Sequence, residues 1–211
     1  MPDLQVIDQL LGRYQLVSDQ VDKTELRIIL SALNQQIALH DAGAVVEFGC
    51  YVGTTSLFMR RLLDRHGSVH DFHVYDSFEG LPEKSDYDLS PAGAQFVAGE
   101  LSVSRKDFLM QFKKAGLRPP VVHKGWFSEL TSDEIPQDII FAYLDGDYYE
   151  SIHDSLRLIT PKLARGWAII VDDYANEALP GAARAVNEWI RGRAVDLRVE
   201  ASLAIIHDKT S

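Results

Sequence analysis

The chain has 211 residues, of which 46% are hydrophobic and 25% are charged, and this composition is that of an ordinary soluble protein with one sizeable core. Its formal net charge of −10 argues against non-specific binding to nucleic acid or to an anionic membrane, because both require a basic surface. No apolar run approaches the roughly 18 residues of a membrane span and no basic and then apolar segment opens the chain, so we expect no signal peptide and a cytoplasmic location.

Residues 3–40 have the apolar spacing of two helices. The apolar positions are Leu4, Ile7, Leu10 and Leu11 in the first helix and Leu26, Ile29, Leu30, Leu33 and Ile37 in the second. Either Asp22 or Thr24 could cap the second helix at its start. We therefore divide the chain into an N-terminal helical segment, residues 1–40, and an α/β domain, residues 41–211.

A strand, a glycine turn and a helix start follow in residues 45–56, which read VVEFGCYVGTTS. Gly49 and Gly53 allow a sharp turn and a close approach to a ligand, and the first N–H groups of the helix are free donors. The spacing is E-x-G-x-x-x-G, whereas a dinucleotide site prefers G-x-G-x-x-G, and the carboxylate of Glu47 would repel pyrophosphate. A cationic ligand fits better, and S-adenosylmethionine carries both a sulfonium and an ammonium group.

Residues 72–76, FHVYD, form a short apolar strand that ends in an acid. In a doubly wound sheet Asp76 lies beside the glycine turn and can accept both hydroxyls of a ribose. Asp76 could instead begin a turn, and Glu47 could have a purely structural role. The single cysteine, Cys50, excludes an intramolecular disulfide, and we expect its small side chain to pack under the turn.

The segment 77–100 has neither a helical nor a strand period, and glycines and prolines are scattered among its acids and serines. Loops longer than about 12–15 residues in a compact domain are usually functional or mobile. We therefore expect a lid on the substrate side of the site, with an ordinary surface insertion as the alternative.

The remaining elements alternate between helices and strands. We expect helices at 104–115, 149–163 and about 179–191, and strands at 121–123, 139–144, 167–171, 197–199 and 203–206. The apolar runs at 139–144 and 167–171 lack strict alternation, as strands buried on both faces should. The last two strands are so close in sequence that only a hairpin can join them. The predicted fold is a single doubly wound, Rossmann-like α/β domain, with a mostly parallel seven-stranded sheet and an antiparallel edge hairpin.

Two of the buried strands end in acids, Asp145 and Asp147 after one and Asp172 and Asp173 after the other. Parallel strands bring their carboxyl ends to one edge, where ligands bind. Carboxylates that meet there repel each other, which implies a shared proton, a basic partner or a metal ion. A divalent cation is the simplest resolution, and oxygen ligands favour magnesium, calcium or manganese over zinc. The alternative is that these acids separately cap turns at the strand ends.

Other candidates precede or follow the same edge in the chain. His123, Lys124 and His153 could each serve as a base or an anion anchor, or could be ordinary surface or core residues. Gly125 would allow a close approach of the backbone to a ligand. Trp126 could cover a flat base or simply pack in the core.

Five segments, EFGCYVGTTS, YDSFEGLP, HKGWF, YLDGDYYES and IIVDDY, resemble the macrocin O-methyltransferase family of class I methyltransferases, which depend on S-adenosylmethionine and magnesium. Members of this family methylate sugar hydroxyls in antibiotic and other natural-product pathways. The similarity spans about residues 45–190, and its first segment also resembles the cofactor turn of catechol O-methyltransferase. The resemblance implies that residues 41–211 form a class I methyltransferase domain whose acceptor is a hydroxyl of a sugar or diol.

Carried over by position, the resemblance implies a cofactor site made of Glu47, Gly49, Tyr51, Ser56, Asp76, Ser77, Gly125, Trp126 and Asp145. Glu47, Gly49 and Ser56 would line the methionine end. Asp76 would hold the ribose, while Gly125 and Trp126 would flank the adenine.

The resemblance also implies that Asp145, Asp172 and Asp173 hold magnesium. The metal would bind two oxygens of the acceptor and lower the pKa of the hydroxyl to be methylated, and Asp145 would take the proton. Since methyl transfer in line from sulfonium to oxygen cancels charge, we expect positioning and desolvation to supply most of the catalysis.

Two rival functions remain at this stage. A nicotinamide-dependent oxidoreductase is disfavoured by the missing third glycine and by Glu47. A catalytically silent cofactor-binding or assembly module would keep the same fold, although the complete set of acids at the strand ends argues against it. We expect a small-molecule acceptor, no nucleic-acid or membrane partner, and we allow for a homodimer.

Overall fold

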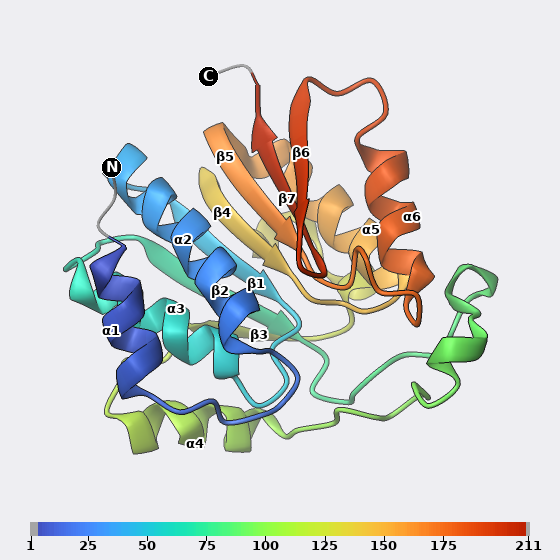
Figure 1. The fold of residues 1–211 in the computed structure, drawn as a ribbon, viewed down its shortest axis with the longest axis horizontal. Coiled ribbons are helices and arrows are strands. Elements are labelled where there is room, and N and C mark those ends of the chain that lie inside the picture. Colours follow the sequence, from blue (N-terminus) through green and yellow to red (C-terminus); the bar gives the residue numbers. More distant parts are fainter. Residues whose placement is uncertain (1–3, 210–211) are drawn as a thin grey trace.

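Within residues 4–209, the part of the chain that the computed structural model describes, seven strands form one twisted sheet with helices on both faces (Figure 1). The strands are β1 Ala44–Phe48, β2 Asp71–Asp76, β3 Val121–Lys124, β4 Ile139–Leu144, β5 Leu163–Val171, β6 Val195–Glu200 and β7 Leu203–Asp208. Residues 1–3 and 210–211, the outer ends of the two predicted segments, lie outside the described residues.

The spatial order of the strands is β3-β2-β1-β4-β5-β7-β6. Strands β1 to β5 pair in parallel, and β7 lies antiparallel to both β5 and β6. This topology confirms the predicted doubly wound α/β fold with its mostly parallel seven-stranded sheet and antiparallel edge hairpin. The order reverses between β1 and β4, and in open α/β sheets the crevice at such a reversal is where ligands bind.

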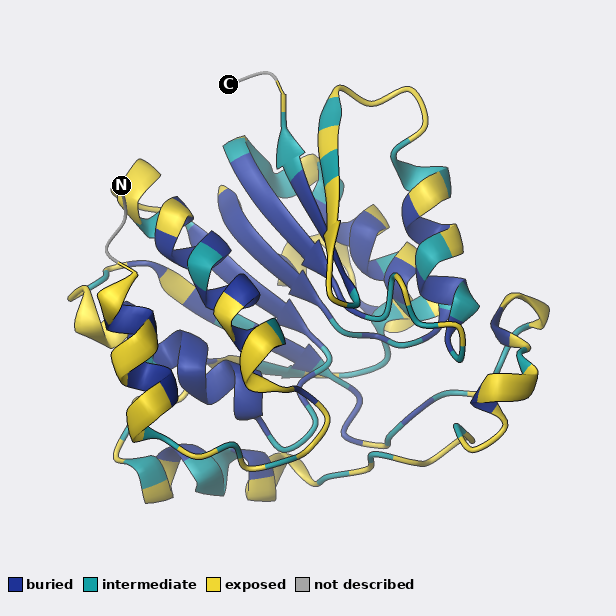
Figure 2. Ribbon diagram, viewed as in Figure 1, coloured by how far each residue is buried: buried dark blue, intermediate teal, exposed yellow. Residues whose placement is uncertain are grey.

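Four helices cover one face of the sheet and two cover the other among the described residues (Figure 1). The first face carries α1 Gln5–Arg13, α2 Lys23–Leu39, α3 Thr54–Arg65 and α4 Arg105–Ala115, and the second carries α5 Tyr149–Ile159 and α6 Pro180–Trp189. Figure 2 shows buried central strands and helices that expose their outward faces. The N-terminal helices therefore pack into the same core as the sheet. None of the helices in residues 4–209 is long and apolar enough to cross a membrane.

The second N-terminal helix is capped by Asp22, one of the two predicted caps. The Asp22 side chain accepts hydrogen bonds from the N–H groups of Thr24 and Glu25, and Glu25 accepts one from the backbone N–H of Asp22 at 3.0 Å. Such a reciprocal pair satisfies the free donors of a helix start.

The predicted helix at 149–163 is too long. Helix α5 ends at Ile159, a single 3₁₀ turn spans Thr160–Lys162, and β5 begins at Leu163 rather than at residue 167. Pro161 explains the early end, since proline has no N–H to donate and its ring clashes with the preceding turn of a helix. Because β5 starts early, Leu163 pairs with Ile139 at the start of β4.

The predicted lid segment, residues 77–100, is irregular apart from two 3₁₀ turns at Asp86–Asp88 and Pro91–Gly93. It runs outward along the edge of the domain and returns toward α4 (Figure 1). Buried Asp88 anchors it by accepting a hydrogen bond from the backbone N–H of Tyr149 at 2.7 Å. A second anchor joins the Ser90 hydroxyl to the carbonyl of Glu177 at 2.7 Å. The segment is thus tied to the start of α5 and to the connection between β5 and α6, and its movement over a ligand stays a prediction.

Candidate active site

A cavity of about 340 Å³ lies at the carboxyl ends of the parallel strands, where β1 and β4 adjoin. Most of the predicted site residues line it, namely Gly49, Tyr51, Asp76, Ser77, Trp126, Asp145, Asp172 and Asp173. The lid segment contributes apolar side chains, including Leu81 and Phe96. The sheet therefore brings the glycine turn, the predicted ribose acid and the acids of β4 and β5 together around one space.

The glycine turn is pressed against the end of β4. Gly49 has φ of +84°, and a Cβ placed on it would lie 1.9 Å from the carbonyl oxygen of Asp145. No residue with a side chain fits at such a distance, so Gly49 is needed both for its backbone angle and for this close approach. Tyr51 also has positive φ, at 46°, an uncommon conformation for a residue with a side chain. The turn thus approaches Asp145 through Gly49 and presents Tyr51 to the cavity.

Asp76 holds two turns in place. One carboxylate oxygen accepts a hydrogen bond from the backbone N–H of Cys50 at 2.8 Å, and the other accepts one from Phe78 at 2.6 Å. Its carbonyl accepts a further bond from the N–H of Gly125 at 3.0 Å. The turn-forming role considered for Asp76 is therefore present in the structure. Each carboxylate oxygen can accept more than one hydrogen bond, so this role leaves room for a ribose diol.

Three of the predicted cofactor residues do not line the cavity. Glu47 and Ser56 are 1% and 0% exposed, and the Ser56 hydroxyl donates a short hydrogen bond to the Glu47 carboxylate behind the turn. Burial raises the pKa of Glu47 to about 8, against the effect of the Ser56 bond. Gly125 likewise contributes no surface to the cavity and pairs with the backbone of Asp76. Direct contact of these residues with a cofactor stays a prediction.

The acids of β4 and β5 lie side by side because Leu144 pairs with Val171 in the sheet. Between the carboxylates of Asp145 and Asp172 lies the hydroxyl of Tyr143, a buried residue that sequence reasoning missed. It donates a short hydrogen bond to Asp172 and lies 3.2 Å from an oxygen of Asp145. The pairing register therefore produces a compact cluster around one phenol.

Burial, and then repulsion between neighbouring carboxylates, raises the pKa of Asp145 and of Asp147 well above the usual range of aspartate. The same two causes raise the pKa of Asp173 to about 7. Burial also raises the pKa of Asp172, although hydrogen bonds from Tyr143 and Asp173 act in the opposite direction. The raised pKa values therefore reflect buried carboxylates that repel each other without a compensating positive charge.

The cavity wall as a whole is acidic. Its carboxylates belong to Asp19, Glu25, Asp76, Asp145, Asp147, Asp172 and Asp173. No lysine, arginine or histidine in residues 4–209 contributes to this wall. Oxygen donors without a basic partner suit a hard divalent cation. Over the same residues, however, no three acid, histidine or cysteine side chains converge as metal ligands do. The carboxylates therefore have the ligand type and the location of a cation site, and their side chains would have to turn toward each other to bind the ion.

Several of these wall residues were not predicted as site residues. Asp147 had a local signal, because it stands two residues after Asp145 in LDGD, and its φ of 60° belongs to the tight turn there. Glu25 and Ser202 had none, since they are 177 positions apart in sequence and meet through a 2.7 Å hydrogen bond. Asp19 comes from the connection between α1 and α2. The N-terminal segment and the β6-β7 hairpin thus form part of the wall.

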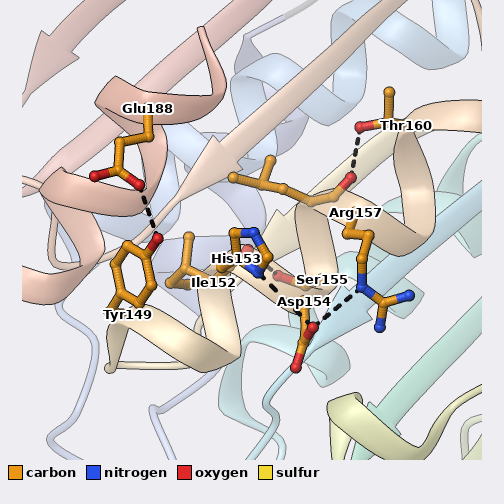
Figure 3. A network of polar contacts seen from close by, with 9 residues as sticks. Tyr149, Ile152, His153, Asp154, Ser155, Arg157, Thr160 and Glu188 are labelled. Atoms are coloured by element: carbon orange, nitrogen blue, oxygen red, sulfur yellow. Dashed lines mark hydrogen bonds and ion pairs between the residues drawn. The ribbon is translucent and has the colours of Figure 1, made fainter. Parts of the chain in front are cut away.

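The candidate bases His123, Lys124 and His153 lie away from the cavity wall. His123 is paired with His73, with 3.1 Å between Nε2 and Nδ1. Lys124 forms an ion pair with Glu79 at 3.3 Å. His153 lies on α5 next to Asp154 and Arg157, as Figure 3 shows. The structure therefore leaves the carboxylates as the candidate bases.

The family model described as Macrocin-O-methyltransferase (TylF) matches residues 17–203. A relative from Streptomyces olivaceus, 8-demethyl-8-(2,3-dimethoxy-alpha-L-rhamnosyl)-tetracenomycin-C 4'-O-methyltransferase, is 34% identical over 72% of this chain and 59% of its own length. Demethyldecarbamoylnovobiocin O-methyltransferase of Streptomyces niveus is 31% identical over 70% of this chain and 58% of its own length. Among solved structures, the O-methyltransferase NovP gives a TM-score of 0.79 at 24% identity and covers 98% of this chain and 88% of that chain.

The chain spans about three fifths of the length of these two curated relatives. The likeness to NovP shows that the α/β sheet has the class I methyltransferase fold. The family match is wider than the segments in residues 45–190 that carried the resemblance, and it includes the N-terminal helix α2. The protein belongs to the macrocin O-methyltransferase family.

Proposed function

We propose that the protein is an S-adenosylmethionine-dependent O-methyltransferase that methylates a hydroxyl of a small molecule, a sugar or diol of a natural product. One observation carries the proposal. The turn at Gly49, the acid Asp76 and the carboxylates of Asp145 and Asp172 surround a single cavity at the reversal of strand order. Family membership supports the same activity.

The cofactor half of the site is formed by the first three strand ends. Asp76 would accept the ribose hydroxyls through the oxygen lone pairs that its backbone bonds leave free. Trp126 and Phe127, which line the same cavity, would cover the adenine. The glycine turn and Tyr51 would then face the methionine end, next to Asp145.

The acceptor half is formed by the carboxylates of β4 and β5. We propose that Asp145, Asp172 and Asp173 hold a divalent cation, magnesium by its preference for oxygen ligands. When bound there, the cation would polarise a coordinated hydroxyl of the acceptor and lower its pKa. The raised pKa values and the absence of basic side chains on the wall formed by the described residues support this assignment.

Asp145 is the proposed base, since it lies at the junction of the glycine turn and the acid cluster. It takes the proton of the acceptor hydroxyl while the hydroxyl oxygen forms a bond to the methyl carbon. The bond between that carbon and the sulfur breaks, and S-adenosylhomocysteine leaves. Leu81, Phe96 and Leu101 from and beside the lid segment line the cavity and would exclude water from the reacting groups.

A screen for methylated products tests the proposal. The protein is incubated with methyl-labelled S-adenosylmethionine, magnesium, and a library of free sugars, glycosides and catechol-like diols, and the products are analysed by mass spectrometry. Asp145→Asn keeps the shape and one oxygen but removes the charge, so it should lose most activity while binding S-adenosylhomocysteine as the wild type does. Label transfer at equal rates in wild type and Asp145→Asn would contradict the assigned base, and full activity in excess chelator would contradict the metal. Cofactor binding without any product in the screen would favour the silent binding module.

A further inference from the structure

We propose that Tyr143 is a positioning residue, whose hydroxyl holds the carboxylates of Asp145 and Asp172 in the orientation that a divalent cation requires. The inference rests on the proposed function, because it assigns a role toward the metal that these acids are proposed to hold. Tyr143 lies within the apolar run of β4, before the acids that follow the strand, so no sequence motif points to it.

The geometry of two neighbouring strands places Tyr143 directly beneath the acid pair. Side chains two positions apart on a strand lie on the same face of the sheet, so Tyr143 and Asp145 share a face. On β5, Ile170 pairs with Tyr143, and Asp172 follows two positions later on the same face. The tyrosine ring is 0% exposed and belongs to the apolar core on that face. The buried ring therefore fixes its hydroxyl against the two carboxylates.

The hydrogen bonds divide the carboxylate oxygens into held and free ones. The Tyr143 hydroxyl contacts the Oδ2 atoms of both Asp172 and Asp145, the latter at 3.2 Å. Oδ1 of Asp172 accepts a hydrogen bond from the N–H of Asp173 at 2.7 Å, and the Ser202 hydroxyl, which bonds to Glu25 at 2.7 Å, lies 3.2 Å from the same oxygen. No donor in residues 4–209 occupies Oδ1 of Asp145, a residue that lines the cavity. The single proton of the phenol fixes Asp172 through the shorter contact, and the phenol oxygen limits the position of Oδ2 of Asp145 at 3.2 Å. Oδ1 of Asp145 remains available for a ligand.

The chemistry of the donor also suits a metal site. Two carboxylates at adjacent strand ends repel each other and would otherwise turn apart. A lysine or arginine between them would hold the pair but would also compete with a cation for it. A neutral phenol donates a hydrogen bond without adding positive charge. Supporting hydrogen bonds of this kind orient metal ligands, and their loss typically lowers metal affinity by about 10- to 100-fold.

Tyr143→Phe is the direct test, because it keeps the buried ring and removes only the hydroxyl. Titration of the metal-free protein with Mn²⁺ or Mg²⁺, followed by calorimetry, should show affinity about 10- to 100-fold lower than in the wild type. Binding of S-adenosylhomocysteine should be unchanged. Methyl transfer should fall at low metal concentration and recover as the metal approaches saturation, which a general loss of structure would not allow.

Tyr75→Phe is the matched control. Tyr75 is another fully buried tyrosine, on β2, and its hydroxyl donates to the carbonyl of Glu134 at 2.8 Å, outside the cavity wall. It should change thermal stability without changing metal affinity. Equal metal affinity in Tyr143→Phe and wild type, or equal weakening in both variants, would overturn the inference. Should Tyr143→Phe fail to fold at the assay temperature, the metal titration is repeated at lower temperature with saturating S-adenosylhomocysteine, which binds and stabilises the folded state. Metal affinity equal to that of the wild type under those conditions would overturn the inference.

The outcome for the proposed function is read separately. A wild-type protein that transfers methyl groups but binds no divalent cation would overturn both the metal assignment and the role of Tyr143, while the methyltransferase assignment would stand. A wild-type protein that binds the metal but transfers no methyl group to any compound of the library would contradict the activity and leave the Tyr143 measurement informative.

Discussion

Replacing Asp76 by alanine should weaken cofactor binding by an amount that follows from its bonds. Loss of two hydrogen bonds from a carboxylate to a ribose should cost on the order of 1.5–3 kcal/mol, which is about ten- to a hundredfold in affinity. The structure adds a second effect, because the N–H groups of Cys50 and Phe78 lose their acceptor, at 2.8 and 2.6 Å. Both hydrogen bonds are only partly buried, so loss of the acceptor should lower the free energy of unfolding by about 1 kcal/mol for each.

Calorimetric titration with S-adenosylhomocysteine measures the first effect, and chemical denaturation of the free protein measures the second. Asp86→Ala is a suitable control, since it removes the same charge from an exposed position of the lid segment. It should leave both quantities near the wild-type values. Unchanged cofactor affinity in Asp76→Ala would refute the reasoning, while lower stability alone would leave Asp76 with only its turn-forming role.

Four further outcomes follow from the structure. Gly49→Ala should lower the free energy of unfolding by at least about 2 kcal/mol, because it adds a clash with Asp145 to the strain of positive φ. Gly116 has φ of +66° and nothing within 4 Å of an added Cβ, so Gly116→Ala should lose only about 1 kcal/mol. Equal losses in the two variants on chemical denaturation would show that the clash at Gly49 has no effect. The melting temperature of metal-free protein should fall as pH rises from about 4 to about 8 and then level off. The pKa is raised in the folded state from 3.8 to about 7 in Asp173 and from 4.5 to about 8 in Glu47, so within this interval the folded state holds protons that the unfolded state has lost. Magnesium should oppose the fall, and a rising melting temperature would contradict the sign. Limited proteolysis within residues 77–100 should slow when cofactor and acceptor are added, and equal rates would argue against a lid. Sugars that carry a diphosphate should be poorer acceptors than neutral glycosides of the same sugar, because the seven carboxylates of the cavity wall repel an anionic substrate. A preference for the diphosphate in competition assays would show that the wall does not select acceptors by charge.

The elements of the fold could be read from local patterns. The apolar spacing of 26–37 predicts a helix, the run at 139–144 predicts a strand buried on both faces, and both are present as α2 and β4. Gly49 and the acids after β4 and β5 were also visible, because turns and strand ends need particular residue types. Such features depend on neighbours within a few positions, which is the range over which backbone geometry and side-chain periodicity act.

The composition of the cavity wall depended on which strands pair and in which register. Pairing of β4 with β5 sets Asp145 beside Asp172 and puts Tyr143 beneath them, although nothing near residue 143 marks it as a site residue. Glu47 is buried outside the cavity wall, where its carboxylate accepts a hydrogen bond from Ser56 of the helix after the turn. Glu25 and Ser202 meet across 177 positions only because the N-terminal helix and the edge hairpin pack over the same strand ends. The sequence by itself thus determined the elements and the acids that they present, and tertiary packing decided which of these side chains share one cavity, because contacts between distant segments leave no local pattern in the chain.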